Sequence, residues 1–546
     1  MGVMGRKNNV LLGIAVILSS ALSACAALPL PVPYIVFESS TPYSPTQTMP
    51  TPEHIFTGMK SQDRPTPPIP NAKPTGFADP PPGDGYDRYF NQTVTWGSCT
   101  SKGSSQCATV LAPLDWEDPD GQAITLVMRR KKATGPPAIP GSPDLFINPG
   151  GPGGSAQDYV SYFDSDGLAG FNIVGLDPRG SGESTPVRCG TMAQIDAYFD
   201  LDSSPDSDDE RQALIDGTLA FTEQCLETSG PLLDHVSTIE AVYDFDMVRH
   251  LLGNEKFNWL GTSYGTFIGA VYLELYPQNA GRMILDAAVS ISDPGDGTDE
   301  VGVSQADGFE LALTKYAEWT VKTGRSISVE SFKKKLIDFI ESLDGQPIRV
   351  GNRLLTQSLF IIGLATFMYS GTDAYPTLAS ALSAAMDQRQ GGVMLMMADQ
   401  MNGRSNSGYS PMATAFPGIG CKDWADPGIE VMFHHWQTLG ARLPVFGQYF
   451  GADLVCSLWP VQPAAQIDFR GADAPPFLVI GGTGDNATPY QYSVSMAKIM
   501  PSAILVTRDG VGHGSYSAGS DCIDKIVRAF LSKGDLPEDG VKCQMD

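Results

Sequence analysis

Three side chains far apart in the chain have the types and surroundings needed for nucleophilic acyl transfer. The first, Ser263, is the central residue of G-T-S-Y-G at 261–265, which fits the G-x-S-x-G pattern of a strained strand-to-helix turn. Residues 257–260 are predicted to form a strand and residues 264–276 a helix, which is the context that this pattern requires. The alternative is an ordinary glycine-rich turn with a buried serine, so the interpretation depends on whether the chain also supplies a base and an acid.

A serine hydroxyl is a poor nucleophile until a base takes its proton, and histidine is the usual base near neutral pH. Of the 6 histidines, His513 lies in G-V-G-H-G at 510–514, on a loop just after a late predicted strand. Folds with a G-x-S-x-G serine turn carry their base on such a loop, so we predict that His513 is the general base. The others lie in a proline-rich segment or on or beside predicted helices: His54, His235, His250, His434 and His435.

The imidazole of a catalytic histidine must be held in one tautomer by an acid. Asp485 follows a predicted strand at 477–481 within a glycine-rich loop, and Ser263, Asp485, His513 is the typical chain order of a nucleophile-elbow fold. Asp286 is the alternative, because it ends the preceding predicted strand and some proteins of this fold take their acid from that position. We favour Asp485 because Pro489 limits its turn.

The negative charge that develops on a substrate carbonyl needs preorganised backbone donors. The glycine-rich segment N-P-G-G-P-G-G at 148–154 follows a predicted strand in the position of an oxyanion loop, and we predict the N–H groups of Gly151 and Tyr264 as donors. The alternatives are a flexible loop or a phosphate cradle, but no Lys-Ser or Lys-Thr pair follows the glycines. The nearby segment 177–184, D-P-R-G-S-G-E-S, is interpreted as a structural turn pinned by an ion pair of its own aspartate and arginine.

Composition bounds the class of protein. With 546 residues the chain is too long for one compact core, and two domains are the starting expectation. Lys plus Arg number 36 and Asp plus Glu 61, which gives a net charge of −25. Such a surface repels phosphate backbones, so we do not expect nucleic acid as a partner.

Strands and helices alternate up to about residue 289 and again from about residue 471, which predicts a mostly parallel sheet covered by helices. The intervening residues are predominantly helical, and a helical insertion between late strands of one sheet can roof a pocket at the strand ends. We therefore predict an α/β-hydrolase fold, with a catalytic domain of residues 91–289 and 471–546 and a large helical cap domain of residues 290–470.

The N-terminal residues have the pattern of an export signal. Residues 1–25 combine two early basic residues, a short apolar run and the lipobox-like sequence L-S-A-C, which predicts export and lipidation of Cys25. An ordinary secretory signal is the alternative. Residues 26–90 are rich in proline without apolar periodicity and are predicted to be an extended tether. We expect the protein on the outer face of the cell membrane, held by its lipid, or secreted.

The chain has 9 cysteines, and removing Cys25 leaves an even number in an exported protein, which favours disulfides over metal ligation. Sequence proximity suggests Cys99 with Cys107, Cys189 with Cys225, Cys421 with Cys456, and Cys522 with Cys543, although eight cysteines formally allow 105 pairings. No cysteine or histidine cluster has the spacing of a zinc site, so no metal is predicted.

Taken together, five motifs resemble the actinobacterial tripeptidyl aminopeptidase family, secreted or lipid-anchored exopeptidases related to prolyl aminopeptidases. The motifs are N-P-G-G-P-G-G-S at 148–155, D-P-R-G-S-G-E-S at 177–184, G-T-S-Y-G-T at 261–266, G-T-G-D-N-A-T-P at 482–489 and G-V-G-H-G-S-Y at 510–516. The similarity spans about residues 96–543. It implies a serine peptidase acting on peptide N-termini without a cofactor, with the triad carried by Ser263, Asp485 and His513.

An aminopeptidase should hold the ammonium group of its substrate with carboxylates. The predicted cap offers Glu310 and Asp423 as candidates for this role, together with Glu300, Asp307 and Glu318. For Asp423, which stands in a Cys-x-Asp pattern like that of the family, the alternative is a structural turn. Two other functions remain open: a carboxylesterase or lipase with the same triad, acting on a small ester, and a catalytically inactive surface lipoprotein that only binds.

Overall fold

The computed structural model describes residues 49–50, 55–56, 75–99, 105–136, 139–163, 168–292, 303–424 and 428–546. The predicted export signal and Cys25 lie outside the described residues. Among the helices of the described residues, none combines the length and the apolar character needed to cross a membrane.

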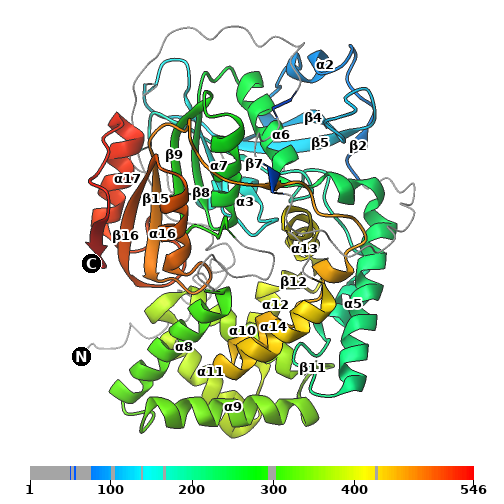
Figure 1. The fold of residues 1–546 in the computed structure, drawn as a ribbon, viewed down its shortest axis with the longest axis vertical. Helices are drawn as coiled ribbons and strands as arrows, with labels where there is room; N and C mark the ends of the chain where they lie inside the picture. The colour runs from blue at the N-terminus through cyan, green and yellow to red at the C-terminus, as the bar shows by residue number, and fades with distance from the viewer. Residues whose placement is uncertain are drawn as a thin grey trace, which may run out of the picture.

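The centre of the described part of the chain is a sheet of 11 strands, parallel through its middle (Figure 1). In order across the sheet, the strands are β17 (Val541–Gln544), β16 (Ala503–Val511), β15 (Phe477–Gly484), β9 (Ala280–Asp286), β8 (Phe257–Thr262), β6 (Asp144–Asn148), β7 (Asn172–Leu176), β5 (Ala123–Lys131), β4 (Gln106–Pro113) and β3 (Gly97–Ser98), with β2 (Phe77–Ala78) beside β5. Neighbours from β17 to β7 are parallel, and those from β7 outwards are antiparallel. The mostly parallel sheet predicted from the sequence is confirmed.

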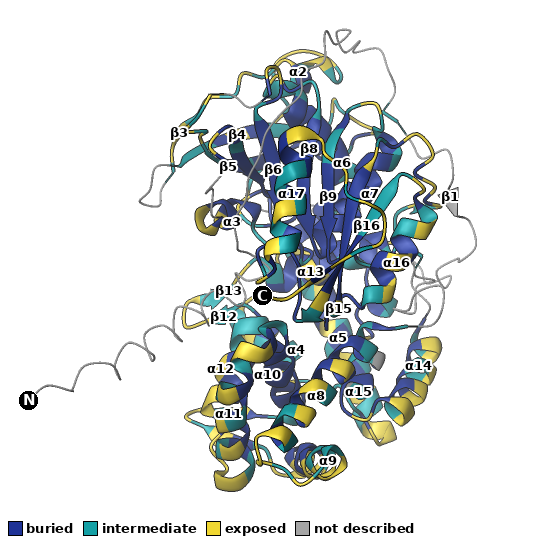
Figure 2. Ribbon diagram, turned by 90° about the vertical axis from the view of Figure 1, so that its left-hand side faces the viewer, coloured by how far each residue is buried: buried dark blue, intermediate teal, exposed yellow. Residues whose placement is uncertain are grey.

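Helices cover both faces of this sheet because its central strands are apolar on both sides. In β6, Leu145 and Ile147 point to one face, where they share a core with α3 (Ala156–Tyr162) and α17 (Asp521–Lys533). Phe146 points to the other face, where α6 (Thr238–Leu251), α7 (Tyr264–Leu275) and α16 (Tyr490–Ile499) pack. This alternation is the period of two of a β-strand, and it makes the sheet the buried centre of the body (Figure 2).

A helical cap lies between β9 and β15 in the chain, as predicted. Its helices are α8 (Gln305–Lys322), α9 (Val329–Gly345), α10 (Gln357–Tyr369), α11 (Tyr375–Gln388), α12 (Gly392–Met401), α13 (Met412–Asp423), α14 (Ile429–Arg442) and α15 (Phe446–Gly451). Most of these helices pack around a core of their own, separate from the two cores of the sheet. α10, the very apolar helix, is buried between its neighbours there.

Two helices before β8 contact both the catalytic body and the cap: α4 (Met192–Phe199) and α5 (Asp208–Ser229). Phe221 of α5 belongs to a core of the sheet. Leu214 of α5 shares an apolar cluster with Trp436 of α14, and α5 runs beside the cap in Figure 1. Asp196 of α4 accepts a hydrogen bond from Nε of Arg404 at 2.6 Å. This segment of the predicted catalytic body therefore also packs against the cap.

The predicted tether is shorter than 26–90. Phe77 pairs with Ile124 of β5, and Tyr89 and Phe90 of the short helix α2 (Asp87–Phe90) are buried in the core. Two apolar aromatic side chains inside a proline-rich stretch anchor it, because burying such rings is strongly favourable. The last part of the predicted tether is therefore part of the body.

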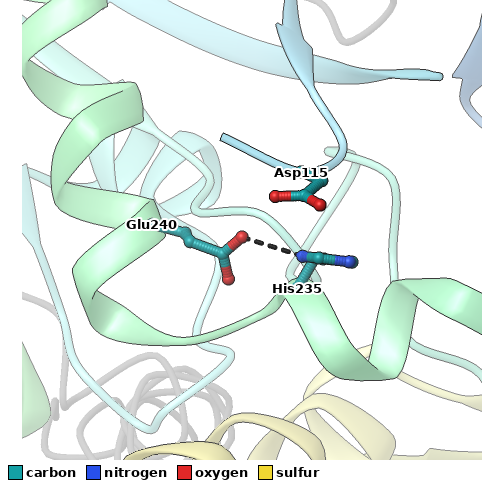
Figure 3. Close-up of side chains that lie close together, drawn as sticks. All are labelled: Asp115, His235 and Glu240. Carbon is teal, nitrogen blue, oxygen red and sulfur yellow. Dashed lines mark hydrogen bonds and ion pairs between the residues drawn. The ribbon is translucent and has the colours of Figure 1, made fainter. Parts of the chain in front are cut away.

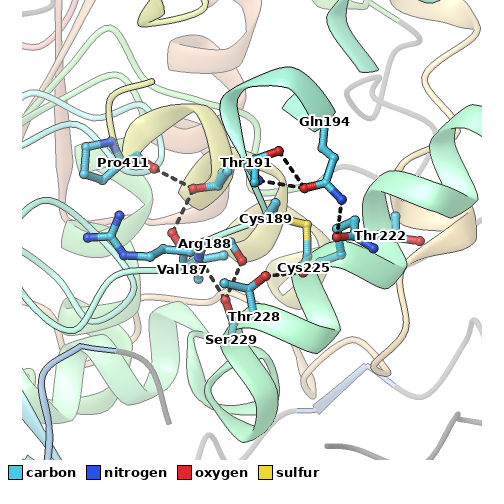
Figure 4. The surroundings of a disulfide bond; sticks show 12 residues. Val187, Arg188, Cys189, Thr191, Gln194, Thr222, Cys225, Thr228, Ser229 and Pro411 are labelled. Atoms are coloured by element: carbon cyan, nitrogen blue, oxygen red, sulfur yellow. Dashed lines mark hydrogen bonds between the residues drawn. A yellow bond between two sulfur atoms is a disulfide. The ribbon is translucent and has the colours of Figure 1, made fainter. Parts of the chain in front are cut away.

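The structure pairs the eight cysteines as sequence proximity suggests: Cys99 with Cys107, Cys189 with Cys225, Cys421 with Cys456, and Cys522 with Cys543. The bond from Cys189 to Cys225 joins α5 to the loop before α4 (Figure 4). Beside it, the hydroxyl of Ser229 donates to the carbonyl of Arg188 and accepts from its N–H, each at 2.8 Å. The segment of α4 and α5 is thus fixed at its base.

Candidate active site

Ser263 occupies a strained turn between β8 and α7. Its backbone has φ 58° and ψ −128°, a conformation that a residue with a side chain rarely adopts. The turn is tight, because a Cβ placed on Gly261 would lie 2.2 Å from the carbonyl oxygen of Gly265. Trp259 braces it by donating from Nε1 to that same carbonyl at 3.0 Å. The strand, turn and helix predicted around the serine are present.

The structure brings Asp485 and His513 together, although they lie in different loops. Nδ1 of His513 is 2.8 Å from Oδ1 and 3.1 Å from Oδ2 of Asp485. The carboxylate also accepts from the N–H groups of Ala487 at 3.0 Å, Thr488 at 2.9 Å and Gly514 at 3.2 Å. A carboxylate held by so many donors is fixed in orientation, and it fixes the imidazole in turn.

Electrostatics keep this carboxylate ionised. Burial alone would raise the pKa of Asp485, but the charge and hydrogen bond of His513, with the N–H of Thr488, outweigh burial and lower the pKa below its ordinary value. The anion stabilises a positive charge on the imidazole and selects the tautomer with the proton on Nδ1.

Asp286, the alternative acid, is engaged elsewhere. Its carboxylate accepts from the N–H groups of Ser515 and Tyr516 at 2.8 to 3.0 Å, and its carbonyl accepts from the N–H of Ser263 at 3.0 Å. Burial raises the pKa of Asp286, against the opposing effect of these N–H groups. The residue thus ties the end of β9 to both the serine turn and the histidine loop.

The histidine loop lies against the serine turn and under the cap. A Cβ on Gly514 would be 3.7 Å from Cγ2 of Thr262, the residue before Ser263. From the cap side, the ring of Tyr369 meets the imidazole of His513 edge-on, with centroids 5.5 Å apart and planes at 90°. The imidazole is thereby confined between the body and α10.

The predicted oxyanion loop packs directly on Ser263. Gly150 has φ 92°, and a Cβ there would lie 2.8 Å from Cβ of Ser263 and 2.9 Å from the backbone nitrogen of Tyr264. Asn148 shapes the loop by accepting the N–H of Gly150 on Oδ1 at 2.8 Å. The structure therefore places Gly151 next to a residue that touches the start of α7.

Asp177 anchors the far end of the oxyanion loop. It accepts from the hydroxyl of Ser155 at 3.1 Å, from the N–H and side-chain amide of Gln157 at 3.1 and 2.7 Å, and from the N–H of Glu183 at 2.9 Å. Burial raises the pKa of Asp177 to about 6 in spite of these hydrogen bonds. The carboxylate joins the loop to the turn that follows β7.

Arg179 does not pair with Asp177, contrary to the sequence-based interpretation. Its guanidinium binds Asp244 of α6 with two hydrogen bonds, at 2.7 and 2.8 Å, and donates to the carbonyls of Leu114 and Pro113. The side chain is fully buried, and such a group is stable only with this complete set of acceptors. The segment is structural, as predicted, but through a different partner.

A cluster of Asp115, His235 and Glu240 lies beside this arginine, with ligand-type atoms within 4.8 Å of one another (Figure 3). Nδ1 of His235 is 3.0 Å from Oε1 of Glu240. Nη1 of Arg179 stands 3.4 Å from the same oxygen and lowers the pKa of Glu240 against the effect of burial. A guanidinium at this distance already supplies the positive charge, so the cluster is an ion-pair network.

The two carboxylates proposed for substrate binding have partners within the protein. Glu310 pairs with Nζ of Lys333 at 2.8 Å inside the cap, so its charge is already compensated. Asp423 is the last residue of α13 rather than part of a turn, and it accepts from Thr238 and from the hydroxyl of Tyr264. The structure thus connects Asp423, but not Glu310, to the residue after the nucleophile.

Arg508 is a site residue that the sequence analysis missed. It is 1% exposed in the middle of β16 and donates to the carbonyl of Gly512, the residue before His513. Burial lowers the pKa of Arg508, while the charges of Asp485 and Asp286 raise it. The available signal was an arginine in a strand that begins with the apolar run 503–506, since a buried arginine needs anionic or carbonyl partners.

Comparison with known proteins places this geometry in a family. A family model described as "alpha/beta hydrolase fold" matches residues 143–341, and one described as "TAP-like protein" matches residues 443–543. The chain is 32% identical over 490 residues to "Serine protease Hip1" of Mycobacterium tuberculosis, covering 83% of this chain and 91% of that one. It is 33% identical over 477 residues to "Carboxylesterase B" of the same species, covering 82% and 89%. It is 26% identical over 470 residues to "Tripeptidyl aminopeptidase" of Streptomyces lividans, covering 82% and 86%.

The fold and the matches define a serine hydrolase of the α/β-hydrolase fold. Within that class, the chain belongs to the TAP-like family. Because the relatives carry both peptidase and esterase names, the family is broader than the tripeptidyl aminopeptidases that the motifs resemble.

Proposed function

We propose that this protein is an exported serine exopeptidase that releases short peptides, such as tripeptides, from peptide N-termini through an acyl-enzyme on Ser263. The observation that carries the proposal is the pair of Asp485 and His513, held on a loop that packs against the strained serine turn. Simpler residues would serve any structural purpose at these positions. The combination of a strained serine, a fixed imidazole and a buried acid therefore supports a catalytic role.

In the proposed reaction, Nδ1 of His513 donates to Asp485, and Nε2 takes the proton of the Ser263 hydroxyl. The hydroxyl oxygen attacks the scissile carbonyl and forms a tetrahedral intermediate. The imidazolium then gives its proton to the leaving amine, the carbon–nitrogen bond breaks, and an acyl-enzyme remains. Water, deprotonated by the same imidazole, attacks the ester and releases the peptide and the free serine.

The N–H groups of Gly151 and Tyr264 are the proposed donors to the intermediate's oxyanion. The close approach of Gly150 to the serine turn supports this assignment, since a Cβ there would lie 2.8 Å from Cβ of Ser263 and 2.9 Å from the backbone nitrogen of Tyr264. Preorganised donors at this position lower the barrier because they need no reorientation during the reaction.

The second candidate function is hydrolysis of a small carboxylic ester. It is supported by the 33% identity to a protein named carboxylesterase and by the pairing of Glu310 with Lys333, which compensates one carboxylate suggested for binding a substrate ammonium. The catalytic steps are the same with an alcohol as leaving group. The difference between the two functions thus lies in recognition of the amine.

We also propose lipid attachment at Cys25, which would tether the protein to the outer face of the membrane. Metabolic labelling with an alkyne fatty acid should mark the wild type and not Cys25→Ser.

The deciding experiment uses four fluorogenic substrates: a tripeptide amide with a free amine, its N-acetylated form, a prolyl amide and a short-chain ester. We expect wild type to cleave the free-amine tripeptide far faster than its acetylated form, and Ser263→Ala to be inactive. Ser380→Ala, an exposed change on α11, is the matched control and should behave as wild type. Ester cleavage without amide cleavage would support the esterase, and absence of fluorophosphonate labelling would favour an inactive binding lipoprotein.

A further inference from the structure

Helix α13 of the cap touches both parts of the proposed oxyanion hole, and Figure 1 shows it between the sheet and the remaining cap helices. Near its N-terminus, Ala415 lies against the oxyanion loop: a Cβ on Gly153 would be 2.6 Å from that of Ala415. Thr414 fixes this end by donating from Oγ1 to the carbonyl of Val187 at 2.8 Å. The helix therefore rests directly on the loop that carries Gly151.

Its last residue, Asp423, contacts the other side of the proposed oxyanion hole. Oδ2 of Asp423 accepts from the hydroxyl of Tyr264 and from Oγ1 of Thr238, each at 2.7 Å, and Oδ1 accepts from the N–H of Thr238 at 2.7 Å. The two hydroxyls also contact each other. Tyr264 is 3% and Asp423 8% exposed, so these hydrogen bonds are shielded from competing water.

The backbone of Tyr264 is held by its side chain. The residue directly follows the strained Ser263, and its ring packs among Phe267 and Trp424 with centroids 6.1 Å away from each. Its hydroxyl reaches a carboxylate on the cap rather than solvent. A shift of Asp423 would therefore be transmitted through the phenol to the first turn of α7, where the proposed N–H donor lies.

We infer that Asp423 is a positioning residue that fixes the oxyanion donor of Tyr264, so that docking of α13 by the cap completes the oxyanion hole. The inference rests on the proposed function, because it assigns a role within that catalytic site. It gives the cap a part in the chemical step, in addition to any part in substrate recognition.

The charge of Asp423 is less important than its acceptor atoms. Burial raises the pKa of Asp423 to about 6, while the hydrogen bonds of Thr238 and Tyr264 and the charge of Lys422 lower it. In Asp423→Asn, the carboxamide oxygen can accept the N–H of Thr238, while the NH2 group donates to the two hydroxyls, which rotate to accept. Asn should therefore preserve the link, whereas Ala removes it and leaves the Tyr264 hydroxyl with Thr238 as its partner but no anchor on the cap.

The test measures kcat and KM for the best substrate, together with the labelling rate of Ser263 by a fluorophosphonate. Asp423→Ala should lower kcat by about tenfold or more with little change in KM, since loss of a whole oxyanion donor costs about 10² to 10³. Asp423→Asn should restore most of kcat. Tyr264→Phe should resemble Asp423→Ala, and the double variant should be no slower than either single one, because both break one link.

Asp234→Asn is the matched control, since Asp234 pairs with Lys422 at the same end of α13 without contacting Tyr264. It should leave kcat unchanged. Multiplicative losses in the double variant, or an Asp423→Ala enzyme with normal kcat and only a lower melting temperature, would overturn the inference. If wild type is not labelled at Ser263 and cleaves no substrate, the proposed function fails, and the inference fails with it.

Discussion

Asp286 accepts the N–H of Ser515 on both carboxylate oxygens, at 3.0 and 2.9 Å, and so joins the end of β9 to the loop of His513. This role differs from that of Asp485, which bonds the imidazole itself. The two buried aspartates therefore make separable predictions.

Asp485→Asn should lower kcat by about 10⁴-fold with little effect on folding, because an amide selects the wrong tautomer of His513. Asp286→Asn should lower kcat far less, by about tenfold, while reducing the free energy of unfolding by about 1 to 3 kcal/mol through a lost acceptor. Ester or amide turnover and urea denaturation measure both. Equal losses of kcat in the two variants would contradict the assignment of Asp485 as the acid.

Gly150→Ala should lower kcat by about 10²-fold, a loss like that of one oxyanion donor. The reason is steric, since the new methyl group would lie 2.6 Å from the carbonyl oxygen of Thr262 and 2.8 Å from Cβ of Ser263. Gly345→Ala is the control, because nothing lies within 4 Å of that position, and it should match wild type. A fully active Gly150→Ala enzyme would show that the loop is not part of the catalytic site.

Asp177 should make stability depend on pH. Its pKa rises on folding from 3.8 to about 6, so the folded protein binds the proton more tightly. The stabilisation is complete below the unfolded pKa and is lost as the pH rises through about 6. Relative to Asp177→Asn, wild type should therefore lose about 2 kcal/mol between pH 4 and pH 7, at about 1.4 kcal/mol per pKa unit and with part of the stabilisation already lost at pH 4. Urea denaturation of both proteins across this range measures the difference, and a constant difference would contradict the prediction.

Removing the disulfide that joins α5 to the loop before α4, with Cys189→Ser and Cys225→Ser, should lower the free energy of unfolding by about 4 kcal/mol, from its loop of 36 residues. The matched control is Cys99→Ser with Cys107→Ser. The disulfide that it removes closes a loop of 8 residues, so its loss should lower the free energy of unfolding by about 2 to 3 kcal/mol. Activity on a small ester should persist in both. An equal or smaller loss for the longer loop would mean that chain entropy is not the main contribution.

The serine turn, the loops of Asp485 and His513 and the parallel sheet were predictable because their signals are local. The strained turn at Ser263 needs glycines at fixed positions, and the loops of Asp485 and His513 follow recognisable strands. The apolar strands and the Gly and Pro punctuation likewise depend on neighbouring residues only.

The remaining features depend on contacts between distant segments. An amphipathic helix such as α5 shows an apolar face, but the sequence does not state that the partner is α14, about 200 residues later. The predicted ion pair of Asp177 and Arg179 was wrong, although the two residues are close in the chain. Backbone N–H groups bind the carboxylate of Asp177, and the guanidinium of Arg179 reaches Asp244. The link of Asp423 to Tyr264 likewise spans 159 positions.

Two stretches of the chain pack in the cap region, the helices α4 and α5 between β7 and β8 and the cap between β9 and β15, and this constrains how the protein can be engineered. The cap therefore cannot be exchanged as one continuous segment. A chimera that exchanged only the later stretch would keep α5 but lose Trp436, which packs with Leu214. The apolar face of α5 would then be exposed and prone to aggregation. Deleting the cap, or transferring it to another hydrolase body, therefore requires coordinated changes in both stretches of the chain.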